Sequence, residues 1–327
     1  MRTNTVFLVL LAAVLSAPSC IRIMESGEDG ASIIFIECLQ GVSDTTAISV
    51  IATAPRFGYD GSRILSDMNV TLKAGGKEIP LSNAGVEAEL FPKGAYYTTE
   101  KIPGGQTLEI EVSGQGLEPV VATTVKPQEV RPFRMNLERT LLYDEEYSST
   151  DIGTKVIKME ISPDDPEMSD HYYALVFDSI VNDDGYARYG HPIPLLRSNG
   201  FYSSDFGDAV VVSTAFSRWS FFGSRYSFFL ADKVVNAYLW RGASVVKDGK
   251  ITVYFNDYYG AGVGMRAHLF VVSPEFYRYA RSIEYNFDSA DELAPFFPST
   301  YSYTNVQGGC GVFGAVSRYD GEWAEAQ

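Results

Sequence analysis

A short stretch between residues 216 and 226 combines aromatic and cationic side chains. Phe216, Trp219 and Tyr226 alternate there with Arg218 and Arg225. Tyrosine, tryptophan and arginine contribute most to protein interfaces, because each offers a large contact area together with a polar group. The stretch therefore predicts a patch that binds a protein, a peptide or the rings of a glycan. The alternative interpretation is a strand whose aromatic rings belong to the core.

The sequence contains no recognised catalytic or metal-binding motif. The histidines His171, His191 and His268 lie far apart, and none belongs to the H-E-x-x-H pattern of zinc enzymes. No G-x-S-x-G pattern occurs that would place a nucleophilic serine on a sharp turn. We therefore predict no catalytic residue, no metal site and no cofactor.

Acidic residues cluster in predicted loops at 144–146, 164–170 and 183–184. Aspartate-rich loops can bind calcium, but none of these has the spacing of an EF-hand, which favours solvated turns. Two carboxylates about 5–10 Å apart would suit glycoside hydrolysis. The distance between two carboxylates in the folded protein cannot be read from their separation in the sequence. A carboxylate-dependent hydrolase is therefore kept as the second alternative function.

Two cysteines, Cys38 and Cys310, lie in apolar runs without basic neighbours, which does not favour a reactive thiolate. In an exported protein disulfides persist, so these two residues form a candidate disulfide. The alternative is a pair of separate thiols buried in apolar strands.

The overall charge argues against nucleic acid as a partner. The 327-residue chain carries a formal net charge of −15, so it lacks the basic surface that displaces phosphate counterions. The same charge disfavours electrostatic binding to an anionic membrane. Hydrophobic residues make up 46% of the chain, which is ample material for packed cores.

Short β-branched runs bounded by turn residues recur along the chain and predict a mainly β protein. Ser32–Leu39 and Ala47–Ala54 are the first of these runs. Their length and spacing predict an immunoglobulin-like antiparallel β-sandwich over residues 32–130. Residues 131–327 predict a second, larger antiparallel β domain, either a sandwich or a partly closed barrel.

One amphipathic helix is predicted at 274–286, within the second domain. Ser273 occupies the N-cap position and Pro274 the first helical position. Arg278 and Arg281 are expected to face solvent, on the side opposite an apolar stripe. The stripe consists of Phe276, Ala280, Ile283 and Phe287. Such a helix is expected to pack across a sheet face.

The N-terminus predicts export and lipid attachment. Val6–Leu15 is an apolar run too short to span a bilayer but of the length found in signal peptides. A small residue directly precedes Cys20, as in a bacterial lipobox. We therefore predict a signal peptide at 1–19, a lipid on Cys20 and a tether at 20–31. No later apolar stretch is long enough for a transmembrane helix, so the lipid would be the membrane contact.

Two motifs near the C-terminus carry a family resemblance. Ser273–Tyr279 reads SPEFYRY, and Asn305–Gly314 reads NVQGGCGVFG. In this order, and behind a lipobox, they resemble the Bacteroidota lipoprotein family catalogued as domain of unknown function 4249. The resemblance covers nearly all of the chain beyond the signal peptide. It implies a lipid-anchored protein of the cell outer membrane, facing either the periplasm or the cell surface, with no established activity.

The resemblance also implies a class of partner, because members are often encoded beside TonB-dependent outer-membrane receptors. The expected function is a non-enzymatic binding or accessory subunit of such a receptor system. The first alternative is a surface glycan- or peptide-binding protein that uses the aromatic residues at 216–226.

Overall fold

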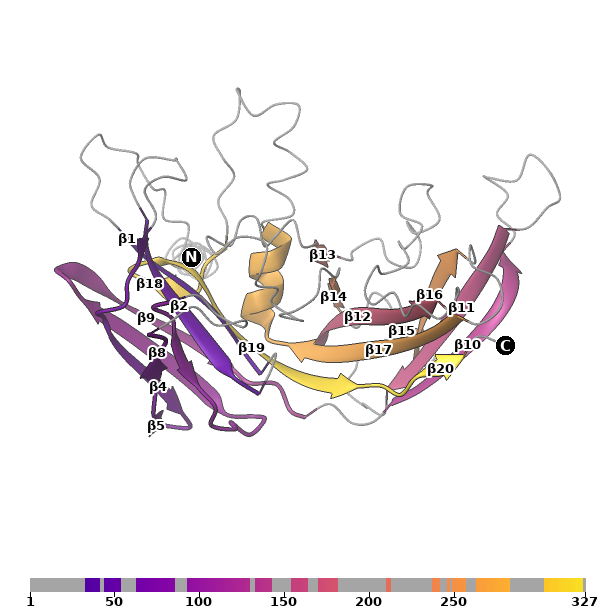
Figure 1. Ribbon diagram of the computed structural model, residues 1–327, viewed down its shortest axis with the longest axis horizontal. Coiled ribbons are helices and arrows are strands. Elements are labelled where there is room, and N and C mark those ends of the chain that lie inside the picture. The colour runs from indigo at the N-terminus through magenta and orange to yellow at the C-terminus, as the bar shows by residue number, and fades with distance from the viewer. Residues whose placement is uncertain are drawn as a thin grey trace, which may run out of the picture.

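The computed structural model describes residues 33–41, 44–53, 63–85, 93–129, 133–142, 154–163, 170–181, 210–212, 237–241, 246–247, 249–256, 263–282 and 303–325. This part of the chain is mainly β, as the sequence predicts, and contains one helix at 274–282. Figure 1 shows a sandwich of strands at the left, a curved layer with the helix above it in the middle, and a second group of strands at the right.

The largest sheet joins the sandwich to the curved layer. Its strand order is β13-β14-β12-β17-β19-β1-β2-β7-β6, with β20 paired to β17 and β3 paired to β2. The strands are β1 (Ile33–Gln40), β2 (Thr46–Thr53), β3 (Arg63–Ile64), β6 (Ser82–Asn83), β7 (Tyr96–Thr98), β12 (Tyr172–Val181), β13 (Val210–Val212), β14 (Ala237–Arg241), β17 (Val263–Val272), β19 (Cys310–Asp320) and β20 (Ala324–Glu325). Among the described strands, β13 and β6 end this order and do not pair with each other, so the sheet is open.

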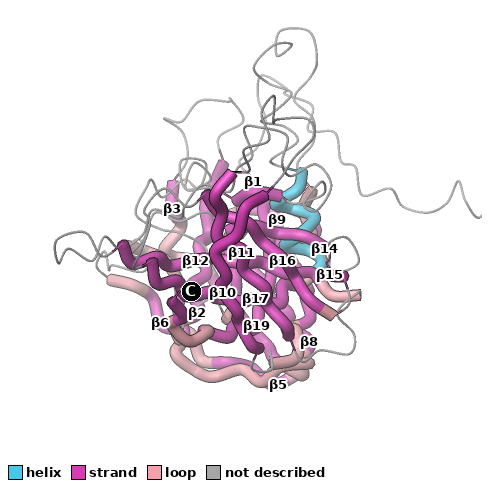
Figure 2. Tube along the Cα trace, turned by 90° about the vertical axis from the view of Figure 1, so that its right-hand side faces the viewer, coloured by secondary structure: helices cyan, strands magenta, loops and turns pink. Residues whose placement is uncertain are grey.

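Two smaller sheets complete the fold. The five-stranded sheet has the order β18-β9-β8-β4-β5 and the four-stranded sheet the order β10-β11-β16-β15. Their strands are β4 (Asn69–Ala74), β5 (Lys77–Ile79), β8 (Thr107–Gly114), β9 (Leu117–Val125), β10 (Phe133–Leu142), β11 (Thr154–Pro163), β15 (Val246–Lys247), β16 (Lys250–Asn256) and β18 (Val306–Gln307). Figure 2 shows β10, β11 and β16 side by side at the end of the molecule that lies at the right in Figure 1.

The five-stranded sheet packs on the part of the largest sheet that contains β1, β2 and β19. These two layers together form the predicted β-sandwich. The alternation of β8 shows how: Leu108, Ile110 and Val112 are buried, whereas Glu109 and Glu111 between them are exposed. Successive side chains of a strand point to opposite faces, so this period of two places one face in the core. The opposing layer contributes Ile34, Ile36, Ile48, Val50, Phe313 and Ala315 to the same cluster.

Strand β19 connects the two halves of the largest sheet. Its first part pairs in parallel with β1, where Cys310 lies opposite Phe35. Its last part pairs antiparallel with β17, where Asp320 lies opposite His268. The predicted domain division between residues 130 and 131 stays a prediction, and both β18 and β19 reach across it to complete the N-terminal sandwich.

The glycines of β19 allow close backbone approach to β1. Gly311 has a φ of +96°, and a Cβ on it would overlap the carbonyl oxygen of Ile36 on β1. Only glycine adopts this conformation without strain. The glycine-rich segment is therefore a strand whose composition permits it to lie directly against β1.

The helix packs on the curved layer and forms a second core. Phe276 and Ala280 are buried against Phe270 of β17 and Val312 of β19. Arg278 and Arg281 are exposed, which confirms the predicted orientation of the helix. The last predicted positions of the helix, 283–286, lie outside the described residues.

Candidate functional site

The face of the largest sheet that carries the helix holds two buried ionisable side chains, His268 of β17 and Glu37 of β1. We call it the helix-side face. The start of the helix is tied to β19 on this face: the backbone N–H of Ser273 donates to the Ala315 carbonyl at 2.8 Å, and the Ala315 N–H donates to the Ser273 hydroxyl at 3.2 Å. Ser273 precedes the helix as predicted, and its hydroxyl oxygen accepts a hydrogen bond from the backbone of β19.

A second polar contact ties the first turn of the helix to the sandwich. The hydroxyl of Thr124 on β9 donates to a carboxylate oxygen of Glu275 at 2.9 Å. Thr124 is almost completely buried, so this hydrogen bond satisfies a hydroxyl that would otherwise be costly to bury. The helix is thus fixed to both β19 and β9, which gives it a defined position over the helix-side face.

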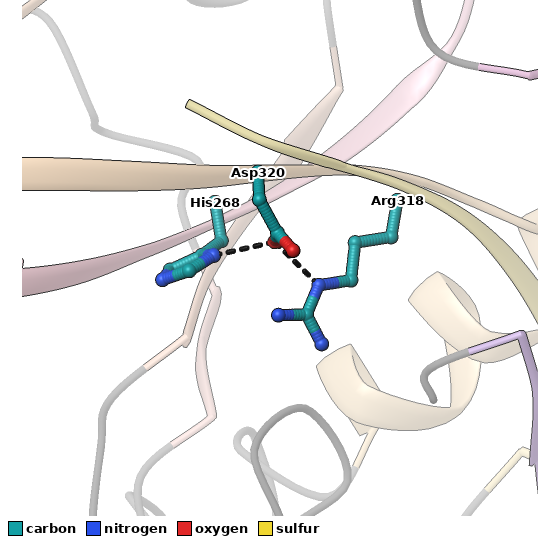
Figure 3. Close-up of polar contacts among 3 residues, drawn as sticks. All are labelled: His268, Arg318 and Asp320. Atoms are coloured by element: carbon teal, nitrogen blue, oxygen red, sulfur yellow. Dashed lines mark hydrogen bonds and ion pairs between the residues drawn. The ribbon is translucent and has the colours of Figure 1, made fainter. Parts of the chain in front are cut away.

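Three ionisable side chains form a connected group farther along this face (Figure 3). The carboxylate of Asp320 accepts hydrogen bonds from Nδ1 of His268 at 2.6 Å and from Nε of Arg318 at 2.5 Å. His268 lies directly opposite Asp320 across β17 and β19, and Arg318 lies two residues before Asp320 on the same face. The Arg318 guanidinium also lies over the ring of Phe270, 5.7 Å from its centre.

The electrostatics of this group favour a charged carboxylate. Burial by itself would raise the pKa of Asp320, but the hydrogen bonds from Arg318 and His268 outweigh burial and hold that pKa below its usual range. A carboxylate bonded to Nδ1 fixes the tautomer and orientation of an imidazole ring. The side chain of His268 is only 2% exposed, whereas that of Asp320 is 49% exposed. The buried ring gives the group a role in holding β17 to β19.

Glu37 of β1 is a buried acidic residue that the sequence interpretation missed. It is 9% exposed, and its Oε2 atom makes no hydrogen bond with any residue that the structure describes. Burial raises its pKa to about 8, so the side chain is largely neutral at pH 7. Burial raises the pKa of Tyr279 on the helix well above its usual value, and the nearby ionisable groups of Glu37 and Cys310 raise it further. A lone glutamate within the apolar run IIFIECL was the available signal.

The two cysteines are free thiols, which corrects the candidate disulfide between Cys38 and Cys310. In the parallel register of β1 and β19, Cys310 lies opposite Phe35, while Cys38 lies opposite Phe313. An offset of three residues corresponds to about 10 Å along the strands, beyond the Cα separation of about 7 Å that a disulfide tolerates. Burial raises the pKa of Cys310 to about 12 and that of Cys38 well above its usual range, in agreement with the prediction of unreactive thiols.

The other predicted site residues lie outside the described part of the chain. They are the lipidation residue Cys20, the binding-patch residues Phe216, Arg218, Trp219, Arg225 and Tyr226, the histidine His191, and the acidic loops at 144–146 and 183–184. The structure describes only Asp170 of the loop at 164–170, and this residue is exposed. Within the described ranges, no group of three histidine, cysteine, aspartate or glutamate residues is placed to hold a metal ion.

Comparison with known proteins identifies the family. Among the described residues, no helix has the length and apolar character needed to cross a membrane. No curated protein and no solved structure matches the chain. The family described as Domain of unknown function (DUF4249) has a model that matches residues 23–321. This match covers more than half of the sequence, and the chain therefore belongs to that family.

Proposed function

We propose that the protein is a lipid-anchored protein of the cell envelope that acts as a non-enzymatic binding or accessory subunit of an outer-membrane receptor system. The observation that carries the proposal is the order of features at the N-terminus. The apolar run Val6–Leu15 is followed by Cys20, and the match to the family model begins at residue 23. This order is that of a signal peptide, a lipidated cysteine and an exported domain.

A lipid on Cys20 would hold the β scaffold at the membrane surface. Each buried CH₂ of an acyl chain contributes about 0.8 kcal/mol, so several chains on one cysteine make the attachment durable. The first described strand begins at Ile33. The 13 peptide links that join Cys20 to Ile33 would span at most about 45 Å, at roughly 3.5 Å per link. The scaffold would therefore remain within reach of other envelope proteins.

The geometry of the helix-side face supports binding better than catalysis. The His268 ring is buried and already bonded to Asp320, and the carboxyl of Glu37 is raised in pKa by burial alone. These groups contribute to packing between strands and helix. The exposed side of the helix, by contrast, carries side chains that are available to a partner.

Mass spectrometry of the protein purified from envelopes tests the anchor. We expect the wild-type chain to begin at a lipid-modified Cys20 and to partition into the detergent phase, and the Cys20→Ser variant to lose both properties. The Cys310→Ser variant is the matched control and should keep the lipid. An unmodified Cys20 in a membrane-free fraction would overturn the anchor.

Affinity purification after solubilising the envelope in mild detergent tests the accessory role. We expect an outer-membrane receptor to be recovered with the wild-type protein in a constant ratio. Recovery of the anchored protein alone, under conditions that preserve other receptor complexes, would count decisively against this role.

A further inference from the structure

The outer side of the helix at 274–282 presents two arginines that the core does not use. Arg278 and Arg281 are three residues apart, which makes them neighbours on one helix face, and both are exposed. Phe276 and Ala280 occupy the opposite, buried side of the same helix. The division between these sides leaves a cationic ridge on a chain whose lysines and arginines number 26 against 41 aspartates and glutamates.

Two partly buried tyrosines flank this ridge. The ring of Tyr172 on β12 lies 4.5 Å from that of Tyr277, which precedes Arg281 by one helical turn. On the other flank, the Arg278 guanidinium lies 6.0 Å from the ring centre of Tyr303. The Tyr303 backbone N–H donates to the Ser282 hydroxyl at 2.8 Å, which fixes the tyrosine beside the helix. Both flanking rings pack on the core beneath the helix.

A third arginine extends the surface onto the sheet. Arg241 ends β14 and lies directly opposite Tyr172 of β12, so the two side chains share the helix-side face. Arg241 is exposed as well. Within the described part of the chain, no carboxylate forms an ion pair with any of the three arginines. We call Arg241, Arg278, Arg281, Tyr172 and Tyr303 the Arg–Tyr surface.

We propose that the Arg–Tyr surface is a docking site for an acidic segment of a partner protein. Guanidinium groups bind carboxylates with two parallel hydrogen bonds, and clusters of them recognise acidic motifs. Tyrosines whose rings are anchored in the core add contact area at little cost in conformational entropy. Arginine and tyrosine together are the composition of interface hot spots, which favours a protein over an anionic bilayer that the chain as a whole would repel. This proposal rests on the accessory role proposed above in one respect, which is that the partner is expected in the cell envelope.

The test measures binding of a fluorescein-labelled oligoglutamate peptide to the full-length protein in detergent, by fluorescence anisotropy at low ionic strength. We expect saturable binding that weakens as salt is added, because the contacts are exposed ion pairs. The double variant Arg278→Glu/Arg281→Glu should weaken binding by at least about tenfold. Arg241→Glu, on a separate element, should weaken it less. The matched control is Arg134→Glu, an exposed arginine on β10 that should leave affinity unchanged.

Several outcomes would overturn the proposal. Absence of peptide binding is one, and equal loss of affinity in the Arg134→Glu control is another. Binding to phosphatidylglycerol vesicles that depends on Arg278 and Arg281, without peptide binding, would assign the surface to lipid. Self-association lost in the double variant, measured by sedimentation, would assign it to a second copy of the chain. Peptide binding does not require the lipid on Cys20. A negative result in the peptide-binding experiment is therefore distinguishable from a negative result in the mass-spectrometric test of the lipid anchor.

Discussion

Gly314 of β19 lies so close beneath Phe276 of the helix that a Cβ built on the glycine would approach the Phe276 Cβ to 2.8 Å. The helix reaches this distance because Ser273 binds Ala315, the residue after the glycine, through both backbone and hydroxyl. The docking of the helix therefore depends on the absence of a side chain at one position of the strand.

Replacing Gly314 with alanine should destabilise the protein by about 1–3 kcal/mol, because the added methyl group forces the helix away from β19. The measurement is the free energy of unfolding from urea titration. Gly85→Ala is the control, since a Cβ at Gly85 would meet no atom of the described residues within 4 Å. Equal stabilities of Gly314→Ala and the wild type would show that the helix is not held at this distance.

The raised pKa of Glu37 predicts a stability that falls with increasing pH. Between the usual glutamate pKa of 4.5 and the folded-state value of about 8, the folded protein retains a proton that the unfolded chain has released. Stability contributed by the neutral carboxyl is therefore complete below pH 4.5 and is lost as pH rises to 8. Glu37→Gln should remove this dependence and exceed the wild type in stability at pH 8 by about 1–4 kcal/mol.

Thermal unfolding of both proteins at intervals from pH 5 to pH 8 provides the comparison for Glu37. The variant Glu109→Gln, which changes an exposed residue of β8, should follow the wild-type curve. A wild-type melting temperature that rises across this interval, with Glu37→Gln less stable at pH 8, would contradict the interpretation of Glu37 as a neutral buried acid.

The pair formed by Asp320 and Arg318 should contribute only about 0.5–1 kcal/mol, because the aspartate side chain is half exposed and solvent screens the charge. A double-mutant cycle of Asp320→Ala and Arg318→Ala measures this coupling. The pKa of Asp320 is held low, so its stabilising effect is present above the usual aspartate pKa of 3.8 and is lost as pH falls through the lower folded-state value. A coupling that vanishes at neutral pH and low salt would be inconsistent with the geometry.

Cys38 and Cys310 should react with iodoacetamide, without added reductant, only after the protein is unfolded. Both thiols are protonated at neutral pH because burial raises their pKa, and protonated thiols react slowly. Intact mass spectrometry after alkylation in denaturant should find both cysteines modified. A mature protein that resists alkylation until reduced would instead demonstrate the disulfide that the strand register disfavours.

Local features of this fold were predictable from the sequence, whereas partners in space were not. Ser273 and Pro274 mark the start of the helix because capping depends on adjacent residues, and the described helix begins at 274 as predicted. The mainly β class followed from β-branched runs, and the family followed from two C-terminal motifs, which the family match confirms. Each of these signals consists of residues that are close together in the sequence.

The pairing of His268 with Asp320 shows what the sequence leaves undetermined. Arg318 and Asp320 are two residues apart on β19, so a shared face could be expected from the period of a strand. Their position opposite β17 depends on strand register, which is set by packing of the whole sheet. The cysteine offset has the same origin, since strands predicted in isolation carry no information on which residues oppose one another. The helix was expected to pack across a sheet face, and its buried side does so. The exposed arginines of the helix became candidates for binding only when the structure placed them beside Tyr172 and Tyr303.

The parallel pairing of β1 with β19 has a consequence for how the chain matures. Cys310 contacts the Ile34 carbonyl across 276 residues of sequence, so the first described strand is synthesised long before the strand that borders it. Until then, one edge of β1 is open, and an open apolar edge recruits other extended chains. Contacts at such sequence separation slow folding. A chain that ends before β19 would therefore lack Phe313 and Ala315 in the core of the sandwich and would leave one edge of β1 without its neighbouring strand.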